Sequence, residues 1–505
     1  MRLRYLFIAV TWLCASLGLR AQVDSLALNY AGTITIDELR EHLTKLASDE
    51  FLGRDTGKEG QKLAAAYLKE QFVKAGIPAV PAPDPASIRE GYYQPFDVVE
   101  VRSGTISIVK DARTYAYGKE LLYFQEVLKA GLGVKELTYV GDLTKAPKVS
   151  LRDKVVLMDA RNLGSGQAAL GTLRTRVELL RAAGASLVIV NMPALADLIA
   201  TTHLSDTHLR LADSGAKETR KEPPTQMILV DESSMDQLLG TTTMAKLRRK
   251  KKARTVACAF ELEVKQGEQR LTAENVLAYI EGTDKKDEIV VLTAHYDHIG
   301  VQDGVVYNGA DDDGTGTVAM IEMAEAFILA KRAGHGPRRS VLVMPVSGEE
   351  KGLLGSRYYS EHPVFPLANT VADLNIDMIG RRDSAHATSP PYIYVIGSDR
   401  LSTGLHQANE LANSLYTKLD LDYTYNAESD PNRFYYRSDH YNFARKGVPS
   451  VFYFSGVHED YHQPGDDVEK IDFDLLHQRT LLAFHTAWIL ANQEERIVVD
   501  KLIKP

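Results

Sequence analysis

Residues 289–316 read IVVLTAHYDHIGVQDGVVYNGADDDGTG, and the rest of the chain can be interpreted outward from this stretch. Ile289–Thr293 is a short run of β-branched and apolar side chains, which is typical of a buried strand. His295 and Asp297 follow it, at the strand end where open α/β sheets place their ligand sites. An imidazole there can bind a metal while the neighbouring carboxylate orients it. A lone histidine at a strand end is more often structural, so this interpretation depends on the motifs that follow.

A turn with three consecutive acids ends the same stretch. Residues 308–316 read NGADDDGTG, and the mutual repulsion of the three carboxylates must be offset. A solvated loop or a calcium loop is possible, but EF-hand loops space their acids at alternate positions and end in a glutamate. Alternatively, one carboxylate bridges two cations. Residues 317–330 have the apolar period of a helix, so the acids lie at a strand–loop–helix junction.

Another predicted strand leads into a pair of glutamates. Residues 341–346 read VLVMPV, a buried type of strand, and continue into Ser-Gly-Glu-Glu at 347–350. Adjacent glutamates are usually surface residues, but their side chains point in different directions. One of the two carboxylates, Glu349 or Glu350, can therefore bind a cation while the other faces a water on that cation, as a metal ligand beside a general base would.

Two further candidates, Asp377 and His462, also follow apolar runs. Asp377 ends the run at 371–377, and His462 lies in a loop after the run at 451–454. Either could be a surface residue if taken alone. The candidates together comprise two histidines and three carboxylates, a set that suits zinc and can hold two cations when one carboxylate bridges them. The predicted metal ligands are His295, Asp311, Glu350, Asp377 and His462.

The order of predicted elements indicates the fold class. Strand-like and helical segments alternate through residues 266–505, which predicts an α/β fold with a mixed, mostly parallel sheet flanked by helices. Residues 22–94 predict helices of the same domain, and their Arg54 either serves a simple turn or braces the site. Residues 95–265 contain short strand-like runs and no metal-type cluster, so they are interpreted as an inserted β-rich domain.

The first residues, Met1–Ala21, have the features of a secretory signal: a basic start, an apolar segment and a small residue at the cleavage point. Its removal takes three arginines and no acid, so the formal charge of −8 becomes −8 − 3 = −11. Such an acidic protein is a poor candidate for nucleic-acid binding. Only Cys258 would remain, so we expect no internal disulfide. We therefore predict export to the periplasm or beyond the cell, without a membrane span in the mature chain.

The motifs, in their order along the chain, resemble those of a known enzyme family. AHYDHIG, NGADDDGTG, SGEEKGLLGS, NIDMIG, RSDHYNF and YHQPGD are similar to motifs of the co-catalytic zinc aminopeptidases of the bacterial leucyl aminopeptidase and aminopeptidase Y type. The resemblance covers residues 34–80 and 270–495. It implies a zinc-exopeptidase fold and hydrolysis of peptides with a free amino terminus. The inserted segment is similar, more loosely, to a protease-associated domain.

The resemblance also implies a role for each matching residue. Asp311 would bridge two zinc ions, with His295 and Asp377 completing one site and His462 and Glu350 the other. A hydroxide between the two ions would attack the scissile carbonyl.

Several supporting features are implied in the same way. Glu349 would be the general base, and Asp297 would support His295. A cis peptide bond is expected after the bridging aspartate, here at Asp311–Asp312. Three further residues are expected near the site: Tyr436, Ser438 and Asp439.

Other interpretations of the same scaffold stay open. A metallocarboxypeptidase needs a cationic pocket for the substrate carboxylate, which Arg381, Arg382 or Arg437 could supply. A glutaminyl cyclase would hold a single zinc, and a receptor would have lost the ligands. The sequence does not indicate the side-chain preference, the length of the released fragment or the oligomeric state.

Overall fold

The structure is a computed structural model, and its chain divides into two units. The first unit comprises residues 1–95 and 273–505, and the second comprises residues 96–272. It describes residues 22–81, 84–102, 106–123, 131–143, 145, 147, 150–164, 167–201, 207–212, 226–249, 253–264 and 267–501. The predicted secretory signal, Met1–Ala21, lies outside the described residues. The predicted insertion, residues 95–265, covers most of the second unit.

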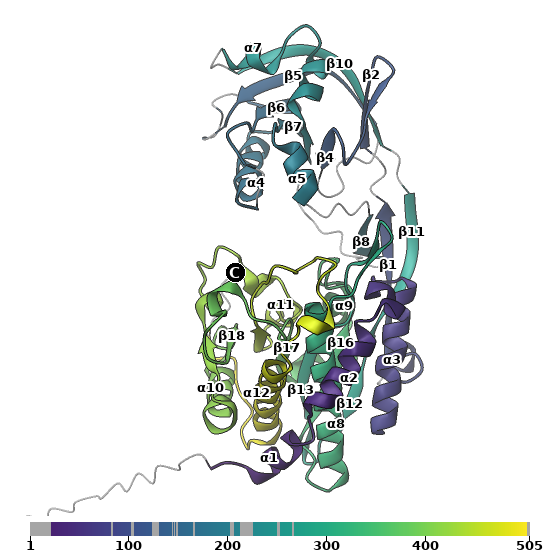
Figure 1. The fold of residues 1–505 in the computed structure, drawn as a ribbon, viewed down its shortest axis with the longest axis vertical. Helices are drawn as coiled ribbons and strands as arrows, with labels where there is room; N and C mark the ends of the chain where they lie inside the picture. The colour runs from purple at the N-terminus through teal and green to yellow at the C-terminus, as the bar shows by residue number, and fades with distance from the viewer. Residues whose placement is uncertain are drawn as a thin grey trace, which may run out of the picture. The chain divides into compact units, whose positions relative to one another are not determined.

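A seven-stranded mixed sheet forms the centre of the first unit (Figure 1). Its four central strands, β16, β13, β17 and β20, run parallel to one another, so that Leu292 lies opposite Val343 on one side and Leu374 on the other. The sequence-based expectation of a mixed, mostly parallel sheet is confirmed. The strands in spatial order are β12 (Ala278–Ile280), β16 (Arg339–Val346), β13 (Lys285–His295), β17 (Thr370–Ile376), β20 (Ser450–Phe454), β18 (Tyr392–Ile396) and β19 (Asp420–Asp422).

Helices cover both faces of this sheet because its strands are apolar on both sides. Val290 and Leu292 of β13 belong to the core that includes helices α8 (Gly316–Arg332) and α12 (Phe473–Asn492). Ile289 and Val291 point to the other face, where the core includes residues of α9 (Leu354–Glu361) and α11 (His440–Ala444). The alternation follows from the two-residue period of a strand.

The N-terminal helices pack on the first of these faces. Thr35 caps α2 (Ile36–Leu46) by accepting a hydrogen bond from the Glu38 amide, and Leu39, Leu43 and Leu46 are buried in the same core. The remaining helices on this face are α1 (Ser25–Ala31), α3 (Glu59–Ala75) and α10 (Thr403–Ala412). Among the described residues, no helix is both long enough and apolar enough to cross a bilayer.

An eight-stranded sheet organises the second unit. Leu157 and Ile189 face one core, and Val156 and Val188 face another on the opposite side of the sheet. The strands in order are β3 (Arg113–Tyr115), β2 (Ile106–Lys110), β10 (Arg254–Val264), β5 (Leu132–Gly141), β6 (Val155–Asp159), β7 (Leu187–Asn191), β9 (Gln226–Val230) and β4 (Leu121–Tyr123). Its helices include α4 (Gln167–Ala182), α5 (Leu195–Thr201), α6 (Glu232–Leu239) and α7 (Met244–Arg248).

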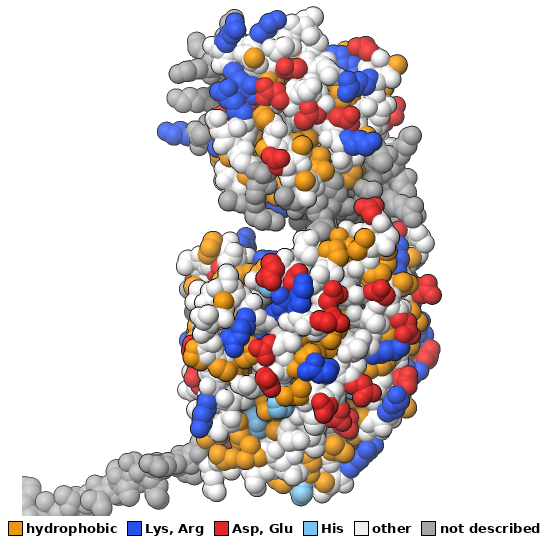
Figure 2. All heavy atoms as spheres, in the orientation of Figure 1, with side chains coloured by type: hydrophobic (Ala, Val, Ile, Leu, Met, Phe, Trp, Pro, Cys, Tyr) orange, Lys and Arg blue, Asp and Glu red, His pale blue; other side chains and the backbone are white. Residues whose placement is uncertain are grey.

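A smaller sheet of three strands contains β11 (Gly267–Val276), β1 (Tyr93–Arg102) and β8 (Thr207–Leu211). Acidic and basic side chains are interspersed over the visible face of the first unit (Figure 2). This mixture is the usual surface of a globular domain.

Candidate metal centre

Most of the predicted site residues lie at the ends of the four central parallel strands or in the loops that follow them. His295 is the last residue of β13, and Asp377 directly follows β17. Glu349 and Glu350 lie three and four residues after β16, and His462 lies in the loop after β20. Because parallel neighbours end at the same edge of a sheet, their following residues converge there.

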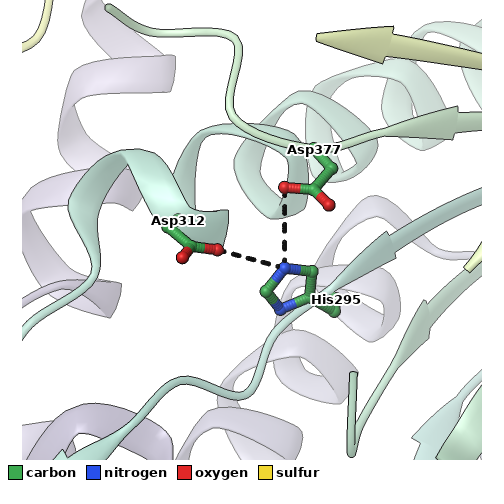
Figure 3. Close-up of side chains that lie close together, drawn as sticks. All are labelled: His295, Asp312 and Asp377. Carbon is green, nitrogen blue, oxygen red and sulfur yellow. Dashed lines mark ion pairs between the residues drawn. The ribbon is translucent and has the colours of Figure 1, made fainter. Parts of the chain in front are cut away.

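One cluster surrounds the imidazole of His295. Its Nε2 lies 3.2 Å from Oδ1 of Asp312 and 3.6 Å from Oδ1 of Asp377. Figure 3 shows both carboxylates pointing toward this same ring nitrogen. All three side chains are buried, and their nearest nitrogen and oxygen atoms are close enough to share one metal ion.

A second cluster shares Asp312 with the first. Nε2 of His462 lies 3.1 Å from Oδ2 of Asp312 and 3.1 Å from Oε2 of Glu350. The two oxygens of Asp312 therefore face different imidazoles. His298 adds a further imidazole, with Nδ1 2.9 Å from Oε1 of Glu350 and 3.9 Å from Oδ2 of Asp312.

The predicted position of Asp311 requires a correction. Its Oδ1 accepts hydrogen bonds from the Gly380 amide at 2.6 Å and the Thr315 hydroxyl at 3.0 Å. Its Oδ2 lies 3.2 Å from Nε2 of His458. This carboxylate lies away from His295 and His462, whereas the two oxygens of the Asp312 carboxylate face one imidazole each.

The expected cis peptide bond is displaced by the same single residue. The structure has it between Asp312 and Asp313, not between Asp311 and Asp312. Asp313 accepts from the amides of Gly316, Met378 and His295, at 2.9, 3.1 and 3.2 Å. The three consecutive acids thus have three different surroundings, which limits their mutual repulsion.

Asp297 connects His295 with Glu349. Its backbone carbonyl lies 3.0 Å from Nδ1 of His295, whereas its carboxylate Oδ1 is 3.9 Å away. The carboxylate instead accepts from the Glu349 amide at 3.2 Å and from the Thr56 hydroxyl at 2.7 Å. The carbonyl orients the imidazole, and the carboxylate positions the backbone of Glu349.

Glu349 itself is close to the first cluster. Its Oε2 lies 3.9 Å from Nε2 of His295. Burial raises the pKa of Glu349 well above its usual range, and although His295 opposes this shift, the nearby charges of Glu350 and Asp377 add to it. A carboxyl group with a raised pKa is suited to exchanging a proton near neutral pH.

Arg54 braces the loops that carry these residues. Its buried guanidinium donates to the carbonyls of Tyr296, Asn308 and Gly309 at 2.7, 2.7 and 2.9 Å. These carbonyls belong to the segment after β13 and to the acidic turn. Burial lowers the pKa of Arg54 to about 10, and surrounding aspartates oppose the shift. Of its two possible roles, bracing is the one that the contacts support.

The acidic turn is held from a second direction by Asp466. Its carboxylate accepts from the amides of Asp311 at 3.1 Å and Asp312 at 3.0 Å. This residue ends the YHQPGD motif that also contains His462. The loop that supplies one imidazole therefore also fixes the backbone of the turn between the two imidazoles.

The RSDHYNF motif contacts the site through Ser438. Its hydroxyl donates to Oδ2 of Asp377 at 2.6 Å and accepts from the Asn375 amide group at 2.8 Å. Asp439 is buried and accepts from Ser356. Tyr436 is 40% exposed, so of the three residues expected near the site it has the least restrained position.

The electrostatics of the clusters favour positive charge. Burial alone lowers the pKa of His295, but Asp377, Glu349 and Asp312 raise it well above its usual value. Burial also lowers the pKa of His462, but Glu350 and, to a smaller extent, Asp312 raise it to about 11. Positive charge between these groups is stabilised, and divalent cations can supply it as well as protons.

Several atoms of the clusters also lack hydrogen bonds. Among the described residues, Oδ2 of Asp312, Oε1 of Glu350 and both ring nitrogens of His298 are buried without a hydrogen bond of acceptable geometry. Short contacts without hydrogen-bond geometry are expected of atoms that surround a common ion. Carboxylate and imidazole donors are also the ligands that zinc prefers, so these residues fit a zinc site.

Sequence reasoning missed His298, Asp312 and Asp466 as contributors to the site. Each lies inside a motif that was recognised, so the motif itself is the only signal that the sequence carries for them. Which residue of a motif faces the site depends on the backbone of a loop, and no simple periodicity governs loops.

A pocket opens onto the first cluster. His295, Asp312, Glu349 and Asp377 line its polar end. The other lining residues are mostly apolar or aromatic: Met378, Phe434, Arg437, Phe452, Phe454, Val457 and Tyr461.

This α/β fold carries carboxylate–imidazole clusters that could hold a metal ion. Residues 275–487 match the model of peptidase family M28. The matched segment contains every predicted metal ligand.

Curated relatives match less than half of the chain. A "Probable zinc metalloprotease" of Pyrenophora teres is 30% identical over 261 residues, which are 44% of this chain and 52% of the relative. A "Probable leucine aminopeptidase" of Arthroderma otae is 29% identical over 212 residues, 41% of this chain and 54% of the relative. The chain therefore spans about half the length of the curated relatives it matches.

Two solved structures match nearly the whole chain. The aminopeptidase from Aneurinibacillus sp. strain AM-1 has a TM-score of 0.59 and 18% identity, covering 95% of this chain and 99% of that one. BSAP, a zinc aminopeptidase from Bacillus subtilis, has a TM-score of 0.53 and 17% identity, covering 93% and 98%. At this identity the likeness establishes a shared fold.

Proposed function

We propose that this protein is a two-metal zinc aminopeptidase that removes residues from the free amino terminus of peptides. The observation that carries the proposal is the placement of Asp312. Its two carboxylate oxygens lie 3.2 and 3.1 Å from the imidazoles of His295 and His462, respectively. A carboxylate between two imidazoles is the arrangement needed to bridge two cations.

The remaining ligands divide between the two ions. His295 and Asp377 would hold one, while His462 and Glu350 would hold the other. When bound, zinc would polarise the scissile carbonyl and lower the pKa of the attacking water towards neutrality. The names of the curated relatives, which include zinc metalloproteases and a leucine aminopeptidase, support the choice of metal and reaction.

Glu349 moves the proton in this reaction. Its carboxylate accepts the proton of the attacking water and then delivers it to the leaving amine as the peptide C–N bond breaks. Asp297 fixes the Glu349 backbone through the 3.2 Å hydrogen bond to its amide. The position of Glu349 is thus fixed by Asp297, which follows the neighbouring strand β13.

The pocket favours an amino-terminal substrate group. The carboxylates at its polar end attract a free amine, and the apolar wall of Phe434, Phe452 and Phe454 suits an uncharged side chain on the first residue. An exopeptidase acting at the amino terminus needs both features.

A panel of aminoacyl fluorogenic substrates tests this function. We expect hydrolysis that is lost with a chelator and restored by zinc, together with two zinc ions per chain by elemental analysis. An amino-blocked substrate serves as the control and should not be cleaved. One zinc per chain with cyclisation of an amino-terminal glutamine would instead favour the glutaminyl cyclase alternative, and no metal uptake would favour a receptor.

Export and the identity of the second unit are also part of the proposal. The basic start, apolar segment and small cleavage residue of Met1–Ala21 support export. The sequence of residues 95–265 is similar to that of a protease-associated domain, which supports that assignment for the inserted segment. Mass spectrometry of the amino terminus of secreted protein tests the first point. A mature chain that still begins at Met1 would contradict it.

A further inference from the structure

Among the described residues that line the pocket at the first cluster, Arg437 is the one arginine, and none is a lysine. It is exposed and forms no ion pair with any carboxylate among the described residues. Its Nη2 donates a hydrogen bond of 3.3 Å to the Tyr461 hydroxyl, and its guanidinium lies over the Phe434 ring at 4.7 Å. The cation is therefore held in place by neutral groups.

Other arginines that might serve a substrate carboxylate are already engaged. Arg381 contacts Asp460 and Glu459, both at 3.2 Å. Arg382 donates to two backbone carbonyls and lies 3.7 Å from Asp472. Arg437 differs from both because its charge faces the pocket without an acidic partner.

The position of Arg437 is linked closely to the reacting groups. The next residue, Ser438, donates to Asp377 at 2.6 Å, so the backbone at 437 is anchored beside a metal ligand. Tyr461, the hydrogen-bond partner of Arg437, stacks on His462 with ring centroids 3.9 Å apart. An extended peptide advances only about 3.3–3.6 Å per residue. Because Arg437 lines the same pocket as His295 and Glu349, a carboxylate one residue beyond the scissile bond can lie beside it.

The chemistry of an unpaired arginine selects a carboxylate. A guanidinium binds a carboxylate through two parallel hydrogen bonds, a bidentate geometry. These hydrogen bonds are stronger in a partly enclosed pocket than in open solvent. The guanidinium repels the positively charged amine of a peptide, whereas the carboxylates at the polar end of the pocket attract it. In a dipeptide bound by its amine, the only remaining charge is the carboxyl terminus, one residue past the scissile bond.

We propose that Arg437 binds the C-terminal carboxylate of short peptides, which makes dipeptides with an uncharged first residue the preferred substrates. This inference rests on the proposed aminopeptidase function and deepens it. Arg437 is a specificity-determining residue in this account, and the zinc ligands and Glu349 act as proposed above.

The test compares Leu-Leu with its C-terminal amide, using release of free leucine by the zinc-loaded full-length protein. We expect wild type to cleave the free acid with a kcat/KM about 10- to 100-fold above that of the amide, as a charged hydrogen-bonded pair implies. Arg437→Gln should remove this preference, and Arg437→Lys should keep part of it. Arg433→Gln is the matched control, because Arg433 is an exposed arginine of the same loop that stacks on Tyr436 outside the pocket lining.

The outcomes separate this inference from the proposed function. Equal cleavage of acid and amide by wild type, or an acid preference that survives in Arg437→Gln, would overturn the role of Arg437 while leaving the aminopeptidase intact. A selective loss of activity on amino-terminal Asp or Glu fluorogens in Arg437→Gln would also overturn the proposed role of Arg437. The arginine would then bind the acidic side chain of the first residue and not the C-terminal carboxylate. Failure of wild type to cleave any substrate of the aminoacyl panel would reject the proposed function itself.

Discussion

Nδ1 of His298 lies 2.9 Å from Oε1 of Glu350, while the other oxygen of that carboxylate lies 3.1 Å from His462. Glu350 is thus contacted on both oxygens by imidazoles, the buried one of His298 and the partly exposed one of His462. His298 fixes which oxygen is free to face a cation at the His462 side of the site. Groups that orient metal ligands in this way are as much a part of a site as the ligands.

We predict that His298→Ala weakens binding of the second zinc ion about 10- to 100-fold and leaves the first nearly unchanged. Competition with a calibrated chelator measures both affinities. The exposed His362 provides the control, and His362→Ala should bind both ions as wild type does. Unchanged affinity for both ions in His298→Ala would show that Glu350 needs no such support.

The neighbouring aspartates 311 and 312 should behave differently when each is changed to asparagine. Asp312→Asn removes the shared carboxylate, so we expect the zinc content to fall from two ions to one or none. Asp311→Asn should keep both ions but lower the melting temperature, because the Asp311 carboxylate bonds to Gly380 and Thr315. Elemental analysis and thermal denaturation give the two readouts. Loss of zinc in Asp311→Asn alone would return the bridging role to Asp311.

Glu349→Gln should retain both zinc ions and reduce kcat about 100- to 10,000-fold, because an amide cannot exchange the proton. In wild type, activity should be present above the pKa of Glu349 and lost as the pH falls through it, since only the ionised form accepts a proton. Burial raises this pKa. The residual activity of Glu349→Gln should lack this acidic limb. Glu361→Gln, on α9 away from the pocket lining, is the control, and an unchanged pH–rate profile in Glu349→Gln would identify another base.

His485 should make the fold sensitive to acid. It is buried in α12, stacks on Tyr416 with ring centroids 3.8 Å apart, and burial lowers its pKa to about 4. An unfolded histidine has a pKa of about 6.5. The unfolded state therefore binds more protons below that pH, so the stability that is full above about pH 6.5 is lost progressively as the pH falls towards 4.

His485→Phe keeps the stacking and removes the titration, so its melting temperature should fall less steeply than that of wild type between pH 6.5 and 4.5. Measurement in the presence of chelator excludes the contribution of zinc loss. His362→Phe replaces an exposed histidine and should follow wild type. Parallel curves for His485→Phe and wild type would mean that other groups cause the acid sensitivity.

The sequence by itself determined the architecture around β13 and the edge of the sheet at which the site lies. The apolar run before His295 and those before Glu349, Asp377 and His462 predict strands, and their alternation with helices makes the strands parallel. Parallel strands end at one edge, so residues nearly 170 positions apart were expected to meet. This inference needs only periodicity and connection rules, which are local properties of the chain.

Only the tertiary structure decided which side chains in the loops face the site. Asp311, Asp312 and Asp313 are chemically identical, and their directions follow from backbone angles that no periodic pattern fixes: φ is −104° at Asp312 and −118° at Asp313. Those angles are held by distant partners, Arg54 and Asp466, which bond to the turn from elsewhere in the fold. A loop takes its conformation from such contacts, so its side-chain directions appear only when the whole chain has folded.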